Sequence, residues 1–535
     1  ERGLVSFANP QSPLEMLTPA QTAISTQYLQ LRIGGDIAAI TGMCKALLDL
    51  DDEAQRNGQP RPIDAGFIAQ HTHGFDAFTT FVRATPWAAI EAESGLTQAE
   101  LEEAATTFSR AKAVIGIYGM GLTQHRKGVM NVQMVSNLLL MGGHIGRTGA
   151  GICPVRGHSN VQGQRTVGIS EKPELVPLDR LAELYRFEPP REKGLNTVET
   201  CEGVIDGSVR GFIGLGGNFV RAVPDTERIE AAWRKLRLTV NVATKLNRSH
   251  LIHGEVSYLL PCLGRIEIDV QASGPQTVSV EDSTGCMHAS VGVADPAVPM
   301  MLSEPAIVAG IAMATLEPNP NVPWKEWVGD YARVRDAIEA TWPEVFKDFN
   351  ARFRVPGGFH RPIPARERVW KTPNGKANFM VPEGLDANPD APSNGVGVLQ
   401  LMTMRSDDQF NTTVYSLDDR FRGVYGTRMV LLMNRGDMAA LGLAEGQLVT
   451  ASTAVADGHA RRVAGLRVTP YDIPRGCVAG YYPECNPLMP LAHHAEESHV
   501  PAAKSIPIRL QPEGGFVAPR AARRARAAIA SNAAG

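Results

Sequence analysis

Cysteine is scarce in this sequence, and closely spaced pairs of metal ligands are scarcer still. Seven cysteines are scattered over 535 residues, and no Cys-x-x-Cys pair occurs among them. This spacing argues against both an iron–sulfur cradle and a disulfide framework. His71 and His73 stand close together, but no third ligand type lies nearby, so they predict no metal site. Reduced thiols and a cytoplasmic location are the simplest expectation.

Long apolar runs and a strong excess of one charge are also missing. No hydrophobic stretch reaches the ~20 residues that a membrane span needs, and a net charge of -3 gives no footprint for nucleic acid. A hydrophobic content of 43% and a charged content of 20% are those of a globular protein. The length predicts about three or four domains. Because the chain starts at Glu1 without a methionine or signal sequence, we expect its natural N-terminus to lie upstream.

The first part of the chain combines helical periodicity with one strand–loop–helix unit. Residues 1–110 are predicted to be mainly helical. Residues 113–118 are a short apolar run followed by glycine at position 119, which is typical of a buried parallel strand that leads into a loop, and residues 128–141 predict the next helix. Ligands of such sheets gather beyond the carboxyl ends of the strands. This rule puts Gln124 and His125 at a candidate ligand edge.

A second unit of the same kind follows. Residues 210–215 and 238–242 predict strands, and residues 225–236 predict the helix between them. The glycine loop 216–219 follows the first strand, but an isolated Gly-x-Gly-Gly pattern is weak evidence for a ligand. A nicotinamide site would need Gly-x-Gly-x-x-Gly and an acidic residue after the second strand, and the sequence has neither. The order of elements predicts the α/β class with parallel sheets.

The last part of the chain changes to short β-favouring segments. Residues 387–394, rich in Pro and Asn, predict a linker. Six segments after it predict a compact barrel: residues 398–404, 428–433, 446–452, 462–468, 476–482 and 504–510. We therefore expect two α/β domains at residues 1–157 and 158–385, a barrel domain at residues 386–515, and a disordered basic tail at residues 516–535.

The densest group of candidate functional side chains lies in residues 152–163. Glycines crowd this stretch and its approach, which predicts a tight, exposed loop rather than a regular element. The loop presents one guanidinium, Arg156, flanked by His158, Asn160 and Gln162. One interpretation is a turn whose polar residues face water. The other is a ligand site on a backbone that a ligand can approach closely.

Residues 119–125 and 137–163 together resemble the central segment of the formate dehydrogenase-like molybdopterin oxidoreductases. The resemblance implies parallel-sheet dinucleotide-binding-like domains followed by a C-terminal double-psi β-barrel. It implies molybdenum or tungsten held between two molybdopterin guanine dinucleotides, a two-electron reaction on a small substrate such as formate, and electron transfer to a [4Fe-4S] cluster. In this family the metal ligand and the cluster cysteines precede the matched segments. We therefore expect them outside this chain.

The resemblance also implies roles for individual side chains. Arg156 matches the arginine that faces the substrate in formate dehydrogenases, and a planar, permanently charged guanidinium can pair with both oxygens of a carboxylate. His158 stands where formate dehydrogenases usually carry glutamine, so this site gains a group that titrates near neutral pH and could relay a proton.

The remaining residues are implied to contact the cofactor. The loop of Gly214, Gly216, Gly217 and Asn218 matches the element that holds a guanine dinucleotide, because glycines let backbone N–H groups reach a diphosphate. The other implied cofactor contacts are Gln124, His125, Asn160, Gln162, Thr244, Arg405, Ser406, Asn411, Asn486 and Lys504.

Two classes of function remain open at this point. The first is a molybdenum oxidoreductase with a small-molecule substrate and an electron-transfer subunit as partners. The second is a cofactor-less scaffold subunit of a redox complex that kept the fold without the chemistry. The presence together of Arg156, the 214–218 loop and Asn486 favours the enzyme, because a scaffold has no physical need for all three.

Overall fold

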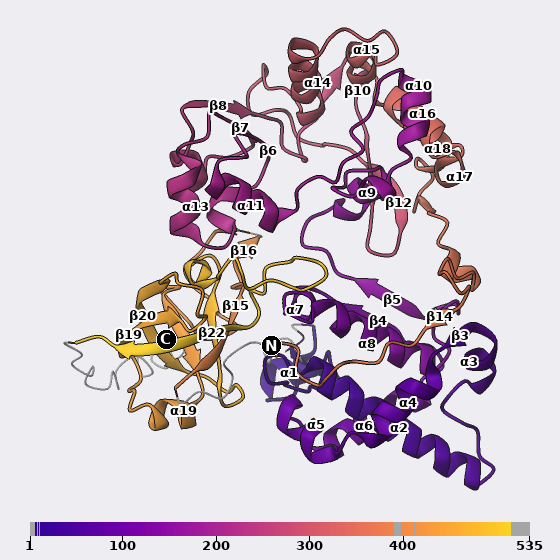
Figure 1. Cartoon of the computed structure of the whole chain (residues 1–535), viewed down its shortest axis with the longest axis vertical. Helices are drawn as coiled ribbons and strands as arrows, with labels where there is room; N and C mark the ends of the chain where they lie inside the picture. Colours follow the sequence, from indigo (N-terminus) through magenta and orange to yellow (C-terminus); the bar gives the residue numbers. More distant parts are fainter. Residues whose placement is uncertain (1–5, 8, 10, 390–396, 411, 515–535) are drawn as a thin grey trace.

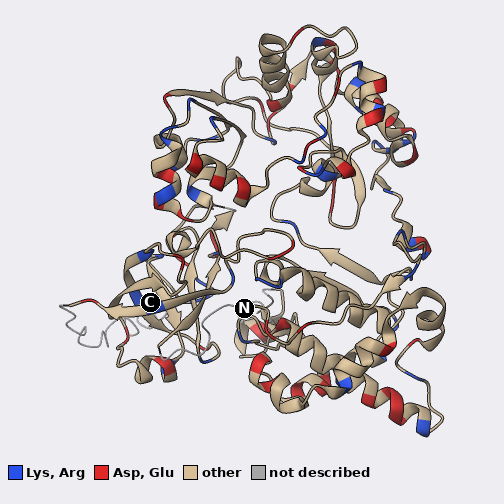
Figure 2. Ribbon diagram, viewed as in Figure 1, with Lys and Arg blue, Asp and Glu red and all other residues tan. Residues whose placement is uncertain are grey.

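The computed structural model describes residues 6–7, 9, 11–389, 397–410 and 412–514. Figure 1 shows three regions: a mainly helical region that contains β4 and β5, a second α/β region around β6 to β8, and a barrel that lies beside both. We call them the first α/β region (residues 36–157), the second α/β region (residues 158–385) and the barrel (residues 399–512). Figure 2 shows that all three carry charges of both signs, as the small net charge leads us to expect.

The first α/β region is built around one long helix. This helix, α2 (Asp36–Arg56), packs against α5 (Trp87–Ser94), α6 (Gln98–Arg110) and α8 (Gly128–Met141). Its apolar core includes the fully buried Leu47, Phe78 and Met134. The helical character predicted for this part is confirmed, and α8 has the predicted bounds. The helices α3 (Ala65–His71) and α4 (Phe75–Ala84) complete this layer.

Two parallel strands form the edge of this region. They are β4 (Ile115–Tyr118) and β5 (Gly151–Pro154). Helix α8 lies directly on β4, because a Cβ added at Gly116 would come within 2.8 Å of Val135 Cγ1. The short helix α7 (Met120–Thr123) follows β4.

The expected loop at residues 152–163 is only partly correct. Its first residues belong to β5, and its last residues begin α9 (Val161–Thr166). Pairing with β4 over four residues satisfies hydrogen-bonding groups of the β5 backbone. This gain outweighs the conformational cost of Gly151 in a strand. Only the residues between Pro154 and Val161 connect the two elements, and Asn160 adopts a left-handed φ of 65° at the start of α9.

The second α/β region repeats the parallel arrangement. Its sheet contains β6 (Gly211–Leu215), β7 (Leu238–Ala243) and β8 (Val256–Pro261), all parallel. Helices α11 (Thr197–Asp206) and α13 (Thr226–Trp233) contribute to its core, in which Trp233 is buried. The predicted strands and helix of this unit are confirmed.

A peripheral part of the second α/β region contains further strands and helices. An antiparallel sheet joins β11 (Val278–Glu281), β12 (Cys286–Ser290) and β13 (Phe359–His360). The helices beside it are α10 (Leu178–Tyr185), α14 (Glu304–Thr315), α15 (Trp324–Gly329), α16 (Tyr331–Thr341), α17 (Pro343–Phe346) and α18 (Phe349–Arg352).

The C-terminal part is a closed six-stranded barrel, which confirms the predicted fold class. The strand order around it is β15-β21-β18-β20-β19-β22. All six predicted segments form these strands: β15 (Leu399–Met404), β18 (Val430–Met433), β19 (Leu448–Thr453), β20 (Arg462–Pro470), β21 (Cys477–Tyr481) and β22 (Ile506–Pro512). Alternate apolar residues fill its interior.

The segment before the barrel differs from an exposed linker where the structure describes it. Ala387 and Asn388 are buried, and the Lys127 N–H donates to the Ala387 carbonyl over 2.8 Å. Residues 390–394 of the predicted linker, the predicted disordered tail at residues 516–535, and Asn411 lie outside the described residues. The domain boundaries remain predictions. No helix in the described part of the chain combines the length and apolar character that a bilayer crossing requires.

Candidate functional site

A cavity of about 740 Å³ lies where the carboxyl ends of β4, β5 and β6 approach the barrel. Three backbone segments and three barrel residues line it: residues 118–123, 154–161 and 212–222 in part, and Arg405, Thr412 and Tyr482. The cavity lies at the strand ends, where ligands of α/β sheets gather, but Gln124 and His125, which the strand-end rule singled out, are not among its lining residues. Seven residues implied by the resemblance lie in this lining: Arg156, His158, Gly214, Gly216, Gly217, Asn218 and Arg405.

Arg156 and His158 occupy the connection between β5 and α9. The Val155 N–H donates to the Tyr118 carbonyl over 2.7 Å, which extends the pairing of β4 and β5 up to the residue before Arg156. Both residues are part of the cavity lining, and both are exposed to solvent. Burial raises the pKa of the Tyr118 hydroxyl, and the positive charge of Arg156 reduces this rise. A guanidinium near a neutral phenol is suited to bind an anion.

The side chains of Asn160 and Gln162 are not part of the cavity lining. They stabilise the segment that carries the lining residues. Asn160 Oδ1 accepts from the Glu281 N–H over 3.0 Å, and Gln162 Nε2 donates to Glu281 Oε1 over 3.0 Å. The buried Glu281 carboxylate also accepts from Thr166 Oγ1 at 2.5 Å and Arg361 Nε at 3.0 Å. These contacts fasten the start of α9 to β11 and thereby position the Arg156 connection. A direct cofactor contact by either amide stays a prediction.

The glycine loop after β6 leaves its backbone open. Gly216 and Gly217 have left-handed φ values of 71° and 75°, and no atom lies within 4 Å of a Cβ added at either position. Asn247 Nδ2 donates to the Gly217 carbonyl over 3.1 Å and steadies the turn. The loop therefore fits a ligand that approaches main-chain N–H groups, such as a diphosphate.

Two neighbours of this loop have different surroundings. A Cβ at Gly214 would come within 2.9 Å of the Phe212 ring, so packing within the strand requires the glycine. Thr244 is exposed just after β7 and is absent from the cavity lining. Asn218 lies in the lining and begins α12 (Phe219–Ala222).

The barrel contributes a stacked pair to the cavity. The guanidinium carbon of Arg405 lies 4.3 Å from the centroid of the Tyr482 ring, and burial lowers the pKa of Arg405. Ser406 is buried behind it and accepts a hydrogen bond from Arg428 Nη1. Arg428 also pairs with Glu484 over 2.7 Å, so Ser406 supports the wall rather than lining it.

Gln124, His125 and Lys504 form a junction outside the cavity lining, in which His125 is buried and the other two residues are partly exposed. His125 Nε2 donates to the Gly121 carbonyl over 2.8 Å, and His125 Nδ1 accepts from Asn388 Nδ2 over 3.1 Å. Burial lowers the pKa of His125 to about 4, so the imidazole is neutral. The Lys504 N–H donates to the Gln124 carbonyl over 3.1 Å, and Lys504 Nζ donates to the Thr403 carbonyl. The junction joins the end of α7 to the barrel.

Asn486 also connects two regions. Its Nδ2 donates to the carbonyls of Arg221 and Val223 over 3.2 and 3.0 Å, directly after the glycine loop. Its Oδ1 is buried and has no partner in the part of the chain that the structure describes. Asn486 thus holds the segment that follows the loop against the barrel.

Sequence reasoning missed several residues of the lining. Tyr118, Met120, Phe219 and Tyr482 lie in it. Tyr118 ends a predicted strand, so the strand-end rule could have found it. Tyr482 had no comparable signal, because only folding of the barrel brings it to the ends of the α/β strands. Among the described residues no group of three His, Cys, Asp or Glu side chains could hold a metal ion.

Comparison with known proteins agrees with this architecture. Residues 399–507 match the family model of the molydopterin dinucleotide binding domain. Over 514 residues the chain is 46% identical to Protein YdeP of Escherichia coli K12, which covers 96% of this chain and 67% of that protein. It is 25% identical over 228 residues to Formate dehydrogenase H of the same organism, covering 41% of this chain and 30% of that one.

A solved structure shows the same fold. Acetylene hydratase from Pelobacter acetylenicus matches with a TM-score of 0.60 at 14% sequence identity, covering 91% of this chain and 71% of that one. Parallel α/β regions joined to a closed barrel with a dinucleotide-binding signature define the molybdopterin-dependent class. The chain belongs to the molybdopterin oxidoreductase family.

Proposed function

We propose that the protein works as a molybdenum or tungsten oxidoreductase of the formate dehydrogenase-like type. It would bind the metal as bis(molybdopterin guanine dinucleotide), act on a small oxyanion such as formate by two electrons, and deliver electrons singly to a [4Fe-4S] cluster. The cluster and the metal-ligating residue would belong to parts of the natural protein outside this chain. One observation carries the proposal: a single cavity combines Arg156, the open glycine loop and the Arg405–Tyr482 pair.

The cavity residues fit such a cofactor. Gly216 and Gly217 present open main chain for a diphosphate, and the positive charge of Arg405 lies in the same lining. Tyr482 offers a ring face already stacked with Arg405. When bound, the cofactor supplies the two-electron redox chemistry, and the protein supplies orientation and electrostatics.

The role proposed for Arg156 is to orient the substrate. Its planar fork pairs with both oxygens of a carboxylate and keeps its charge at every working pH. The Tyr118 hydroxyl, which burial keeps protonated, lies in the same lining and can donate a further hydrogen bond.

The role proposed for His158 is to move a proton. Oxidation of formate to carbon dioxide releases one proton together with two electrons. The imidazole of His158 in the lining can accept that proton and pass it to solvent, because His158 is exposed. Glutamine at the same place could only hydrogen-bond.

We further infer a reducing compartment and an electron-transfer partner. All seven cysteines are free thiols in the structure, which supports the cytoplasm as location. A protein that receives electrons two at a time and releases them singly needs an acceptor, and a separate electron-transfer subunit would serve.

Elemental and nucleotide analysis of the full-length protein tests the proposal. We expect molybdenum or tungsten near one atom per chain and two guanine nucleotides released on denaturation. Absence of both, after expression in a host that makes the cofactor, would contradict it and favour the cofactor-less scaffold.

A further inference from the structure

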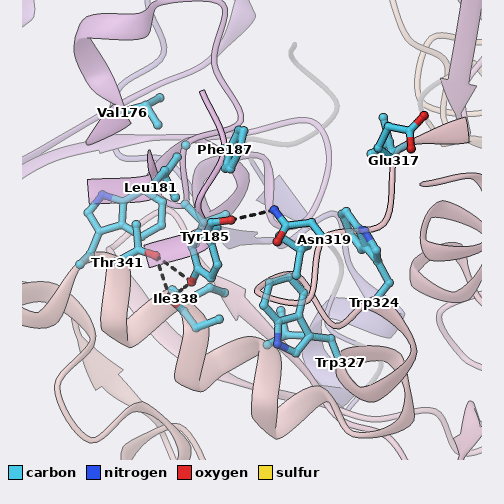
Figure 3. A pocket seen from close by; sticks show the side chains of 17 residues that line it. Val176, Leu181, Tyr185, Phe187, Glu317, Asn319, Trp324, Trp327, Ile338 and Thr341 are labelled. Carbon is cyan, nitrogen blue, oxygen red and sulfur yellow. Dashed lines mark hydrogen bonds between the residues drawn. The ribbon is translucent and has the colours of Figure 1, made fainter. Parts of the chain in front are cut away.

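A second cavity lies in the peripheral part of the second α/β region. It has a volume of about 540 Å³ and is lined by the end of α9, by α10, by the segment from Leu316 to Trp327 and by α16. Figure 3 shows its side chains converging from these elements. It shares no lining residue with the cavity that contains Arg156. Its volume falls within the range of small-molecule sites, about 300–1,000 Å³.

Aromatic rings form the walls of this second cavity. Three of the six tryptophans of the chain line it, namely Trp324, Trp327 and Trp342. Trp327 meets Tyr185 edge to face at 5.7 Å between centroids and meets Trp324 at 5.9 Å. These contacts hold the rings in place without a ligand, so binding would cost little ordering of side chains.

The hydroxyl and amide side chains of the lining, those of Tyr185, Thr341 and Asn319, are already bonded within the protein. The Tyr185 hydroxyl donates to the Ala337 carbonyl over 3.0 Å, and Thr341 Oγ1 donates to the same carbonyl over 2.8 Å. Asn319 Nδ2 donates to the Tyr185 carbonyl over 2.8 Å, and Asn319 Oδ1 accepts from the Asn321 N–H over 2.9 Å. A buried polar group on a ligand would therefore find no hydroxyl or amide of the lining without a bond inside the protein, and its loss of bonds to water would be costly.

The charge of the lining residues also restricts which ligands can bind. No Lys, Arg or His is among its lining residues, and the single charged residue in the lining is Glu317. Figure 3 shows Glu317 at the edge of the group. An anionic ligand would meet this carboxylate and find no cation in the lining to balance it.

We propose that this cavity binds an uncharged, mostly apolar small molecule with an aromatic or alicyclic body. Such a ligand would pack on the rings of Trp324, Trp327 and Tyr185 and would bring apolar surface out of water, which is the main favourable contribution available there. The site is independent of the function proposed above, because it uses none of the same residues.

Fluorescence titration of the full-length protein with the neutral probe N-phenyl-1-naphthylamine tests the proposal. We expect saturable binding to one site, with affinity at least tenfold higher than for the anionic probe 8-anilino-1-naphthalenesulfonate. Ala337→Phe should fill the cavity and weaken binding at least tenfold. Ala340→Phe is the matched control on the same helix, because Ala340 is outside the lining, and it should bind as the original protein does.

A second variant guards against misfolding of Ala337→Phe. Leu316 is 59% exposed and lines the cavity, so Leu316→Asp should fold normally and still weaken binding of the neutral probe at least tenfold. The proposal is overturned if the full-length protein shows no saturable binding. Equal affinity for the two probes, or unchanged affinity in folded Ala337→Phe and Leu316→Asp, would overturn it as well.

Discussion

Arg405 stacks on Tyr482, with the guanidinium carbon 4.3 Å from the ring centroid, and the pair joins two barrel loops in the wall of the main cavity. Tyr482 is 8% exposed. Tyr482→Ala removes both the stack and a large buried ring, so we expect a loss of about 3 kcal/mol in the free energy of unfolding. Tyr482→Phe keeps the ring and loses only a long contact of 3.4 Å to the Ala222 carbonyl, so it should stay within about 1 kcal/mol. Urea unfolding of both variants measures the difference, and equal losses would refute a role for the ring.

Replacement of Arg156 tests substrate orientation. Arg156→Lys keeps the charge and loses the planar fork, so kcat/KM of the full-length enzyme for its substrate should fall about 10- to 100-fold. Arg165→Lys is the control, because Arg165 lies in α9 and pairs with Glu171 at 2.5 Å outside the cavity. Steady-state kinetics of both variants measure this change in kcat/KM. An unchanged kcat/KM in Arg156→Lys would remove this role.

Replacement of the exposed His158 tests the proposed proton relay through the dependence of activity on pH. His158→Gln removes the imidazole that is proposed to accept and pass on the proton, so the pH–rate profile should change. His459→Gln, a substitution of an exposed histidine outside the cavity lining, should keep the original profile. Identical profiles for the original enzyme and His158→Gln would exclude the proton relay.

The buried His125 predicts a pH effect on stability. Burial lowers the pKa of His125 from 6.5 to about 4 in the folded protein. Below pH 6.5 the unfolded chain binds a proton that the folded chain does not. Stability should therefore fall as the pH drops from about 6.5 to 4, by about 3 kcal/mol in total.

The variant His125→Gln isolates this contribution. Glutamine keeps one donor and one acceptor for Gly121 and Asn388 but does not titrate. The unfolding free energy of the original protein should drop more than that of His125→Gln between pH 7 and pH 5. Parallel pH profiles for the two proteins would contradict the assignment of a neutral buried imidazole.

We expect Asn486 to stabilise the junction of the barrel and the second α/β region. Asn486→Ala leaves the carbonyls of Arg221 and Val223 without their donor and should cost about 1–3 kcal/mol. Asn486→Asp keeps the size of the side chain but turns an acceptor toward those carbonyls, so its loss should be at least as large. Chemical denaturation provides the comparison, and a fully stable Asn486→Ala would show that these bonds contribute nothing.

Local pattern was sufficient for helix α8 and for the strands of the barrel. Helix α8 has the predicted bounds, and all six barrel strands lie within two residues of the predicted segments. These elements depend on periodicity and on turn residues, which are readable within one window of sequence. The error at residues 152–163 arose because pairing of β5 with β4 is a contact between residues 36 positions apart, as in Gly116 with Ile152.

The sequence by itself determined the fold class, and it nominated Arg156 and His158 as candidates, which the structure places in one cavity lining. Only the tertiary structure decided which residues share the cavity. Tyr118, Gly217, Arg405 and Tyr482 are far apart along the chain and meet in one lining. It also decided that His125 and Asn486 join regions of the fold, because their partners Asn388 and Val223 lie more than 260 residues away. Contacts over such separations produce no periodic pattern in the sequence, because they depend on how the folded helices and strands pack against one another.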